Sequence, residues 1–439
     1  MIKPKIAILL EFGFHEIKKY IHSGFATELG EELDIVWFAV DKGSKEFHDY
    51  FVSTGFPIVY FNESDFKKGR TSIEQYNQIV RRNWIANKEL GGFHNHSKVR
   101  TKSLKTKIIG SSVAKFLIEK VALKRIQKDY ISATIEKQLT DHSIDQLFLT
   151  GYDSSFAKSF VTTGVSMNKK VHYLVNSWKD LYINNFVPFN ALTTIFVWSE
   201  QMLQDFKYHM PYLKDANFVV SGNPTFDILL NATPIQSRAF YAEKYKLPIK
   251  SKWILYTMMP VGLVLDEIDT IIYTANEIQK HFSTEEVNIL VRKNPTHNSD
   301  DFKTLELPGN LKITDHYCTF DKVKDMIVQS PEGEKEWIDL LLYSEMNLSV
   351  PSTVTLEFLA LEKPILNIAY NSKNEIDSRV TQFFEAGFYK PLFIKKQAAY
   401  CKNSTELISE IKLLLTKDLI LNTGGIVKKR ASTIIIENL

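Results

Sequence analysis

The sequence predicts an α/β fold with two doubly wound parallel-sheet domains in series. Short β-branched runs alternate with longer helical stretches, a rhythm typical of a parallel sheet covered by helices on both faces. The rhythm breaks at residues 229–252, which are polar and contain prolines, and restarts beyond them. With 439 residues, 44% of them hydrophobic, the chain is long enough for two domains with separate cores.

The first domain is expected to cover residues 1–230. We expect strands at residues 5–12, 33–40, 56–61, 145–151, 170–177, 193–200 and 217–224, and helices at residues 15–32, 155–167 and 201–210. Acidic residues follow the first apolar run at once and no small-residue cleavage site appears, so we interpret this run as a strand and not as a signal peptide.

A basic stretch at about residues 97–128 interrupts the first domain. Its only acid is Glu119, and its apolar residues recur at roughly helical spacing, which predicts a basic amphipathic helix. These apolar residues are Ile108, Ile109, Val113, Phe116, Leu117, Val121 and Leu123. The helix either packs one face on the core or rests against anionic lipid headgroups. Nucleic acid is a weaker alternative, because no recognised binding motif accompanies the charge.

The second domain is expected to cover residues 250–425, followed by a closing helical tail at 426–439. We expect strands at residues 253–260, 287–295, 311–315 and 346–350 and helices at residues 266–281 and 334–345. Residues 351–370 then give a turn, a short apolar helix, a Lys-Pro pair and another strand.

Several classes of protein are excluded by what the sequence lacks. It has neither the glycine-rich dinucleotide fingerprint nor a P-loop, so a dehydrogenase or kinase of the familiar types is not expected. Cys318 and Cys401 lack metal-ligand spacing and fit a reducing compartment. No run of about 18 uncharged apolar residues predicts a membrane span, and the net charge of +3 is small.

Residues 351–357, "PSTVTLE", predict an anion site in the second domain. Pro351 fits a helix start, and the hydroxyls of Ser352 and Thr353 can cap the helix. The exposed N–H groups and the helix dipole there suit a diphosphate. Glu357, one turn further on, can accept hydrogen bonds from a ribose diol. The alternative is that Glu357 only stabilises the first helical turn electrostatically.

Four segments resemble GT-B glycosyltransferases of bacterial surface-polysaccharide, capsule and teichoic-acid synthesis. They are "TLEFLALEKPIL" (355–366), "VSGNPTFD" (220–227), "ILVRKNP" (289–295) and "YLVNSWKDLYINN" (173–185). The resemblance covers residues 171–369, whereas residues 1–170 match only in rhythm. It implies the GT-B fold, in which two Rossmann-like domains face a cleft at the carboxyl ends of their strands.

The resemblance also implies that the second domain binds the nucleotide donor and that the acceptor lies against the first. The residues that it assigns to the donor are Arg292, Asn294, Ser352, Thr353, Glu357, Gly222 and Asn223. Arg292 follows a strand and can hold phosphate oxygens bidentately, or it forms a surface salt bridge. Asn294 departs from the family, which has His there. Gly222 and Asn223 permit a tight turn, which is their structural alternative.

Sugar transfer with inversion needs a base that takes the proton of the acceptor hydroxyl. The candidates are Glu11 and His15 after the first strand and Asp153 after the strand at 145–151. As alternatives, His15 is a surface or capping residue and Asp153 caps the next helix. His94 and His96 lie in a glycine-flanked loop, which we assign to the acceptor side because further zinc ligands are missing. We expect no cofactor and no metal, the nucleotide-sugar being a co-substrate.

The sequence therefore predicts a metal-independent transferase that moves a sugar from a nucleotide donor to a surface glycan or a lipid-linked acceptor. We expect it in the cytoplasm, in peripheral contact with the inner face of an anionic membrane, with no nucleic acid partner. One alternative is a glycerol- or ribitol-phosphate transferase that uses a CDP-alditol. Others are a non-hydrolysing sugar-nucleotide 2-epimerase and a non-enzymatic sugar-binding or scaffolding protein.

Overall fold

The computed structural model describes residues 3–11, 14–41, 44–66, 69–88, 90, 103–151, 153–182, 191–213, 216–298, 300–315, 317–321, 326–415 and 429–439. The chain forms two compact units. Unit 1 comprises residues 1–228, 386–388 and 429–439, and unit 2 comprises residues 229–385 and 389–428. Each unit is described by itself below.

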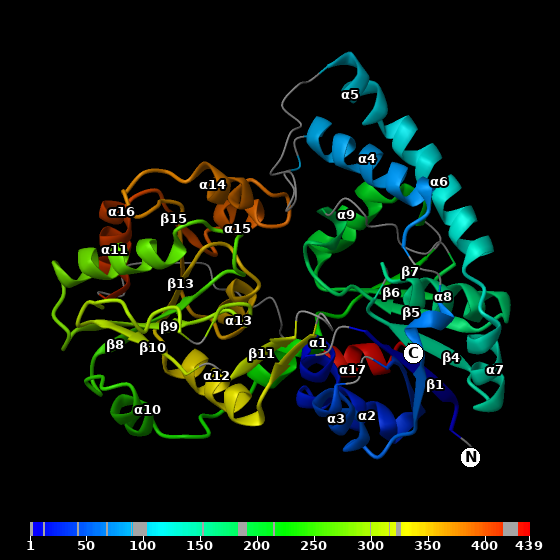
Figure 1. Cartoon of the computed structure of the whole chain (residues 1–439), viewed down its shortest axis with the longest axis horizontal. Coiled ribbons are helices and arrows are strands. Elements are labelled where there is room, and N and C mark those ends of the chain that lie inside the picture. Colours follow the sequence, from blue (N-terminus) through cyan, green and yellow to red (C-terminus); the bar gives the residue numbers. More distant parts are fainter. Residues whose placement is uncertain are drawn as a thin grey trace. The chain divides into compact units, whose positions relative to one another are not determined.

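Unit 1 is built on a seven-stranded parallel sheet (Figure 1) in the order β3-β2-β1-β4-β5-β6-β7. The strands are β1 (Lys5–Leu10), β2 (Asp34–Val40), β3 (Ile58–Phe61), β4 (Gln146–Leu149), β5 (Lys170–Leu174), β6 (Thr194–Val197) and β7 (Asn217–Val220). Strand order reverses after β3, so that β1 pairs with both β2 and β4. Nearly every residue of β1 and β4 is buried, because helices cover both faces of a doubly wound sheet.

Serine or threonine caps begin seven of the fifteen helical segments described in unit 1. The helical segments are α1 (Phe14–Glu16), η1 (Ile17–His22), α2 (Phe25–Glu32), α3 (Lys45–Val52), η2 (Glu63–Asp65), α4 (Ser72–Asn87), α5 (Leu104–Ile109), α6 (Ser112–Asp129), α7 (Ala133–Asp141), α8 (Ser155–Ser166), η3 (Asp180–Tyr182), α9 (Glu200–His209), η4 (Pro211–Leu213), η5 (Pro224–Leu229) and α17 (Ala431–Ile436). At α4 the hydroxyl of Thr71 accepts from the N–H of Glu74, whose carboxylate accepts from Thr71 in return. This reciprocal capping fixes where the helix starts.

The predicted basic helix is two helices, and the face predicted for its core contact is wrong. The chain breaks at Gly110 between α5 and α6. A Cβ at Gly110 would lie 2.4 Å from the backbone carbon of Asn83 on α4, so only glycine permits this close crossing. The buried residues of α6 are Lys115, Glu119, Ala122, Leu123 and Ile126. Of the apolar residues predicted to form one face, Ile108, Val113, Phe116, Leu117 and Val121 are exposed.

A buried ion network joins α4, α6 and α9. The Glu119 carboxylate accepts from the Arg81 guanidinium at 2.9 Å and from the Lys115 ammonium at 2.7 Å. Arg81 also donates to the Leu181 carbonyl and approaches Nδ1 of His209 at 3.4 Å, and Lys115 donates to the His209 carbonyl. Burial lowers the pKa of Lys115 to about 8. The charges therefore hold the α4–α6 hairpin to the rest of unit 1.

Unit 2 contains a six-stranded parallel sheet in the order β10-β9-β8-β13-β14-β15 and a separate antiparallel pair, β11-β12. Its strands are β8 (Lys252–Thr257), β9 (Val287–Arg292), β10 (Leu311–Ile313), β11 (Cys318–Asp321), β12 (Met326–Gln329), β13 (Met346–Ser349), β14 (Ile365–Ile368) and β15 (Ala399–Cys401). Its helices are α10 (Arg238–Lys244), α11 (Glu267–Gln279), α12 (Pro331–Tyr343), α13 (Val354–Ala360), α14 (Ser378–Phe384), α15 (Lys390–Ile394) and α16 (Ser404–Leu415). The β11-β12 hairpin was not predicted.

The polar segment that interrupts the strand rhythm is an ordered part of unit 2. The Arg238 guanidinium stacks 3.9 Å from the centre of the Trp253 ring and donates to the carbonyls of Ile249, Ser251 and Tyr343. Buried Asp339 accepts from the backbone N–H groups of residues 235 and 236. Charged side chains thus attach this segment to the rest of unit 2, although its sequence resembles a linker.

The segment 429–439 belongs to unit 1, where hydrogen bonds to Asp227 hold its start in place. The Asp227 carboxylate accepts from the N–H of Ala431 at 2.7 Å and from the N–H and hydroxyl of Ser432 at 2.8 and 2.6 Å. Asp227 is the acid of the "GNPTFD" segment. Its visible role is to satisfy the N-terminal donors of α17, which packs beside α2.

Replacing Asp227 with alanine is expected to lower the free energy of unfolding by about 2–4 kcal/mol, because a buried acceptor of three hydrogen bonds is lost. Urea unfolding measures this change, and the exposed variant Asp34→Ala serves as the control. A loss no greater than that of the control would show that Asp227 does not hold α17.

No helix among the described residues has the length and apolar character needed to cross a bilayer.

Candidate functional site

In unit 2 the structure brings two predicted donor residues to one aromatic side chain. Arg292 is the last residue of β9, and its guanidinium lies 4.8 Å from the centre of the Trp337 ring. The Trp337 indole N–H donates to Oε2 of Glu357 at 2.7 Å. Glu357 lies in the first turn of α13 and is 7% exposed. Because Trp337 holds both partners, Arg292 and Glu357 belong to one cluster, and we call these three residues the Trp337 cluster.

The turn before α13 differs from the predicted capped helix start. Thr353 is the N-cap residue, but its hydroxyl makes no capping hydrogen bond. The Ser352 hydroxyl oxygen is buried and has no hydrogen-bond partner among the described residues. The neighbouring Thr355 hydroxyl is used instead, since it bonds to Tyr389 at 2.6 Å, and Tyr389 donates to Asn367 at 2.6 Å. A buried hydroxyl without a partner is costly, so Ser352 suits a polar ligand.

Asn294 and its loop are shaped by internal hydrogen bonds. The Asn294 side-chain oxygen accepts from the N–H and the hydroxyl of Thr296 at 3.1 and 3.0 Å. His297, three residues on, lies 2.8 Å from Asp301 through Nδ1 and 3.0 Å from the Met259 carbonyl through Nε2. The His297 ring thus links this loop to the backbone at Met259. This loop carries Lys293 as well, whose pKa is lowered by burial.

The Lys-Pro pair of the resembling segment has a structural role. The Lys363 ammonium donates to the carbonyls of Leu341 and Ser344 at 2.8 and 2.7 Å, and also to that of Leu342. These carbonyls lie at the C-terminal end of α12. Lys363 therefore caps the helix that carries Trp337, and burial lowers its pKa to about 8.

In unit 1 the structure places Glu11 and Asp153 at neighbouring strand ends. Ser154, the N-cap residue of α8, donates its hydroxyl to the Glu11 carboxylate. The helix cap is therefore Ser154, and the alternative interpretation of Asp153 as the cap is wrong. Asp153 instead forms an ion pair with Arg70, and both side chains are about one-third exposed. The Glu11 N–H donates to the buried carboxylate of Glu16 at 2.6 Å.

After β1, His15 lies in the short helix α1, and two lysines follow it in the π-helical segment η1. Lys18 and Lys19 are buried in η1, an unusual helix type that is frequent at functional sites. Desolvation, then the charges of Lys19, Lys18 and Lys179, lower the pKa of His15 to about 4. The positive charges of these lysines disfavour a further positive charge on the imidazole ring. His15 is then neutral at pH 7, as a proton acceptor must be.

Asp180 and Lys19 are ionisable residues that the sequence did not single out. Lys19 donates to the Asn176 side chain at 2.9 Å, and burial lowers its pKa to about 8. Asp180 accepts from the N–H of Ser177 at 2.9 Å, and burial raises its pKa to about 7. The "SWKD" order of residues 177–180 was the available signal. A carboxyl group that titrates near neutral pH is suited to proton transfer.

Asp180 is expected to make the stability of the protein depend on pH. Its pKa is raised by folding, so the folded state holds a proton that the unfolded state has lost. Stability contributed by the protonated form is thus present below about pH 4 and lost as the pH rises toward 7. Between pH 5 and pH 8, wild-type stability should fall by about 2–3 kcal/mol relative to Asp180→Asn. Urea unfolding at both values measures it, and parallel pH profiles would contradict it.

Gly222 and Asn223 lie at the end of β7, next to α17. Gly222 has a φ of +82°, and a Cβ there would lie 3.4 Å from that of Ala431. The Asn223 side-chain oxygen accepts from the N–H of Thr225 at 3.0 Å. These contacts fit the alternative interpretation that Gly222 and Asn223 form a tight turn.

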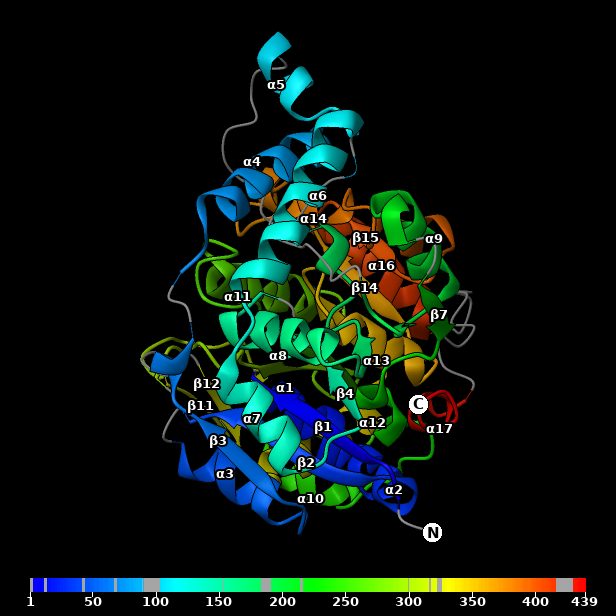
Figure 2. The ribbon, with the colours of Figure 1, turned by 90° about the vertical axis from the view of Figure 1, so that its right-hand side faces the viewer.

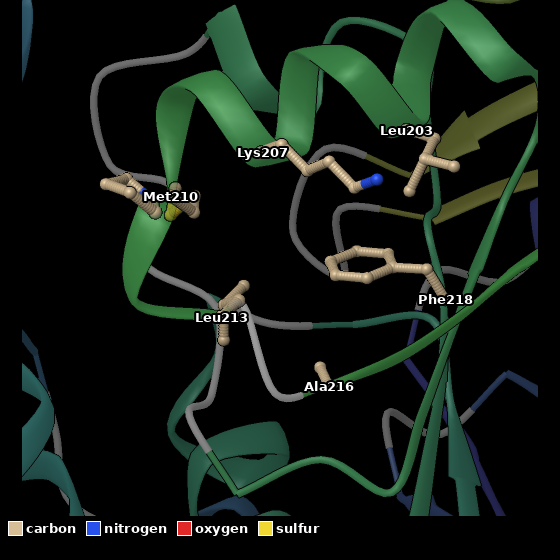
Figure 3. A pocket seen from close by; sticks show the side chains of 7 residues that line it. Leu203, Lys207, Met210, Leu213, Ala216 and Phe218 are labelled. Carbon is tan, nitrogen blue, oxygen red and sulfur yellow. The ribbon is translucent and has the colours of Figure 1, made fainter.

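Two cavities of unit 1 are lined by other residues. The larger, of about 380 Å³, is lined by Leu203, Lys207, Met210, Pro211, Leu213, Ala216 and Phe218. Figure 3 shows the side chains of Lys207 and Phe218 pointing toward one another across it. Neither this cavity nor the second, beside α4 and α6, contains a predicted site residue. The described residues contain no group of three or more His, Cys, Asp or Glu side chains arranged to hold a metal. His94 and His96 lie outside the described residues.

No protein-family model matches the chain, and no curated protein matches it. Solved structures do match. S. aureus MnaA, in a co-structure with UDP, has 10% identity and a TM-score of 0.57, over 99% of this chain and 95% of that one. The UDP-GlcNAc 2-epimerase of Methanocaldococcus jannaschii, in complex with UDP-GlcNAc and UDP, has 13% identity and a TM-score of 0.55, over 99% and 98%.

A glycosyltransferase from Rickettsia africae also matches, with 13% identity and a TM-score of 0.50 over 99% of this chain and 94% of that one. At such low identity the likeness concerns the fold. The parallel sheets of seven and six strands and these matches confirm the predicted fold class. The chain has a GT-B fold.

Proposed function

We propose that the protein is a nucleotide-sugar-dependent glycosyltransferase and that unit 2 binds the nucleotide. The observation that supports this most is the Trp337 cluster, in which a guanidinium and a carboxylate share one indole. The buried hydroxyl of Ser352, without a partner among the described residues, follows strand β13, which β8 separates from β9. In open parallel sheets, ligands bind beyond the carboxyl ends of the strands. Arg292 lies at this end of β9, and Ser352 follows this end of β13.

Each group matches one part of a nucleoside diphosphate. The Arg292 guanidinium suits phosphate oxygens, which it can hold with two parallel hydrogen bonds. The Glu357 carboxylate is an acceptor of the kind that suits the two hydroxyls of a ribose. Ser352 and Thr353 can donate their hydroxyls to phosphate. Asn294 contributes to the shape of the adjacent loop.

The proton acceptor for transfer is proposed to lie in unit 1. His15 is neutral at pH 7, whereas the carboxylates of Glu11 and Asp153 are held by Ser154 and Arg70 respectively. A base works best when its pKa lies near the working pH. Asp180, with a pKa raised to about 7 by burial, fits that requirement better than the three residues predicted from the sequence.

A 2-epimerase is the second candidate. The observation that favours it is that the M. jannaschii structure, named as a UDP-GlcNAc 2-epimerase, matches over nearly the full length of both chains. An epimerase inverts C2 of the sugar without any acceptor, whereas a transferase needs an acceptor. The acceptor proposed for the transferase is a surface glycan or a lipid-linked saccharide.

One experiment separates the two candidates. The full-length protein is incubated with UDP-GlcNAc in D₂O, alone or with a synthetic polyprenyl-diphosphate-linked monosaccharide, and followed by proton NMR. A transferase that accepts these substrates releases UDP only when the acceptor is present. Deuterium at C2 of the sugar in the absence of an acceptor would establish the epimerase activity and overturn the proposed transferase activity. Repeating the incubation with UDP-glucose and GDP-mannose covers other sugars and bases, and Glu357→Gln tests that any activity depends on the Trp337 cluster.

A further inference from the structure

The α4–α6 hairpin of unit 1 presents an apolar surface that nothing in the described chain covers. Its side chains and exposed fractions are Leu104 (74%), Ile108 (60%), Val113 (70%), Phe116 (41%), Leu117 (54%) and Val121 (50%). Figure 1 shows the hairpin extending beyond the sheet of unit 1 with α5 at its tip, and Figure 2 shows the same from the side. Exposed apolar groups gathered on one element usually mark an interaction site.

The hairpin is firmly attached on its inner side, so its outer surface is a stable feature. Glu119, Arg81 and Lys115 form the buried ion network described above. The Trp84 indole donates to the Ser112 hydroxyl at 3.2 Å, and the Asn87 side chain donates to the Thr106 carbonyl at 3.3 Å. Polar bonds therefore use one side of α6 and leave the other side free for a partner.

The same outer surface is basic. Lys105, Lys107, Lys120, Lys124 and Lys128 are exposed on α5 and α6. The acids within residues 104–129 are Glu119, which is buried, and Asp129, which pairs with Arg125 at 2.6 Å. The Lys120 ammonium lies 5.9 Å from the centre of the Phe116 ring. Apolar side chains and unneutralised lysines are thus interleaved along two consecutive helices.

We propose that this outer surface docks unit 1 on an anionic lipid bilayer, with the apolar side chains in the headgroup–acyl boundary and the lysines at the anionic headgroups. Interleaved apolar and basic residues on a helix are the pattern that binds at this interface. A second copy of the chain fits less well, because a two-fold contact would bring both sets of lysines together. The inference is independent of which reaction the protein catalyses.

Sedimentation of the full-length protein with vesicles tests the proposal. We expect pelleting with phosphatidylglycerol–phosphatidylcholine vesicles at low salt, release at high salt, and no pelleting with pure phosphatidylcholine. The double variant Lys120→Glu/Lys124→Glu should bind at least about tenfold more weakly. Val113→Ser/Leu117→Ser, which keeps every charge, should also bind more weakly. Lys137→Glu on α7, an exposed lysine outside the hairpin, is the matched control and should bind as the wild type does.

Lys115→Glu is excluded from the test, because Lys115 lies in the buried network and its loss would perturb folding. Circular dichroism verifies that each variant is folded. The proposal is overturned if the protein stays in the supernatant with anionic vesicles at low salt. It is also overturned if the protein pellets equally with anionic vesicles and with pure phosphatidylcholine vesicles. Sedimentation velocity without lipid gives the remaining outcome, since a dimer that Val113→Ser/Leu117→Ser dissociates would assign the surface to a second copy.

Discussion

Replacing Glu119 with alanine is expected to lower the free energy of unfolding by about 3–5 kcal/mol, the largest effect of any single substitution considered. The side chains of Glu119 and Arg81 are fully buried, and that of Lys115 is 4% exposed. Without the carboxylate, two buried cations lie next to each other and near His209 with no anion between them. Removing one partner of a buried ion network leaves the remaining buried charges uncompensated. Urea unfolding of the full-length protein measures the effect.

The control for Glu119→Ala is Glu136→Ala, which removes an exposed carboxylate from α7 and should change stability by less than about 0.5 kcal/mol. The triple variant Arg81→Met/Lys115→Met/Glu119→Leu replaces all three charges with apolar side chains. It should recover much of the lost stability, because buried ion networks are often matched by apolar packing. If Glu119→Ala and Glu136→Ala unfold alike, the network does not hold the hairpin.

Glu357→Gln and Arg292→Ala are each expected to weaken nucleotide binding about tenfold or more. A hydrogen bond to a charged group contributes roughly 1.5–3 kcal/mol, and 1.4 kcal/mol corresponds to a factor of ten. Glutamine retains an acceptor for the Trp337 indole but loses the charge and one of the two acceptor oxygens. The fold of unit 2 should therefore persist in this variant. Isothermal titration with UDP, GDP, CDP and CMP, using full-length protein, measures the dissociation constants.

Two exposed residues of unit 2 provide matched controls for these variants. Glu332→Gln removes a carboxylate from the first turn of α12, the helix that carries Trp337, and Arg379→Ala removes a guanidinium that is 43% exposed. Both should bind nucleotide as the wild type does. If Glu357→Gln does so too, Glu357 is an acid that stabilises the first turn of α13, as the alternative interpretation states.

Much of the fold was predictable because parallel strands are buried on both faces. The runs around β1, β2, β4, β8 and β9 are short and apolar, and all of them form strands. The basic helix was mispredicted for a tertiary reason. Lys115 and Glu119 occupy the face that packs against α4, where Arg81 completes their charge balance. No local pattern reveals that a partner 38 residues away makes burial of Glu119 favourable.

The candidate site was predictable only at the ends of strands. Arg292 and Glu357 could be proposed because each follows or flanks a predicted strand. Trp337 could not, because it lies inside an apolar helix and its role depends on two residues from other elements. Lys19 and Asp180 were missed because they lie in a π-helical segment and a 3₁₀ turn, whose hydrogen bonds do not follow helical or strand periodicity.

The indole N–H signal of Trp337 gives the most direct test of nucleotide binding by unit 2. The chain has six tryptophans, so a ¹⁵N-tryptophan-labelled sample gives a simple spectrum, and Trp337→Phe identifies the signal. We expect titration with the nucleoside diphosphate that binds to shift the Trp337 signal saturably, because the proposed nucleotide site includes its partners Arg292 and Glu357. The signal of Trp253, which donates to Ser251 and stacks on Arg238, should stay in place. Saturable shifts confined to the unit 1 tryptophans Trp37, Trp84, Trp178 and Trp198, or an unmoved Trp337 signal at saturation, would show that the nucleotide does not bind at the Trp337 cluster.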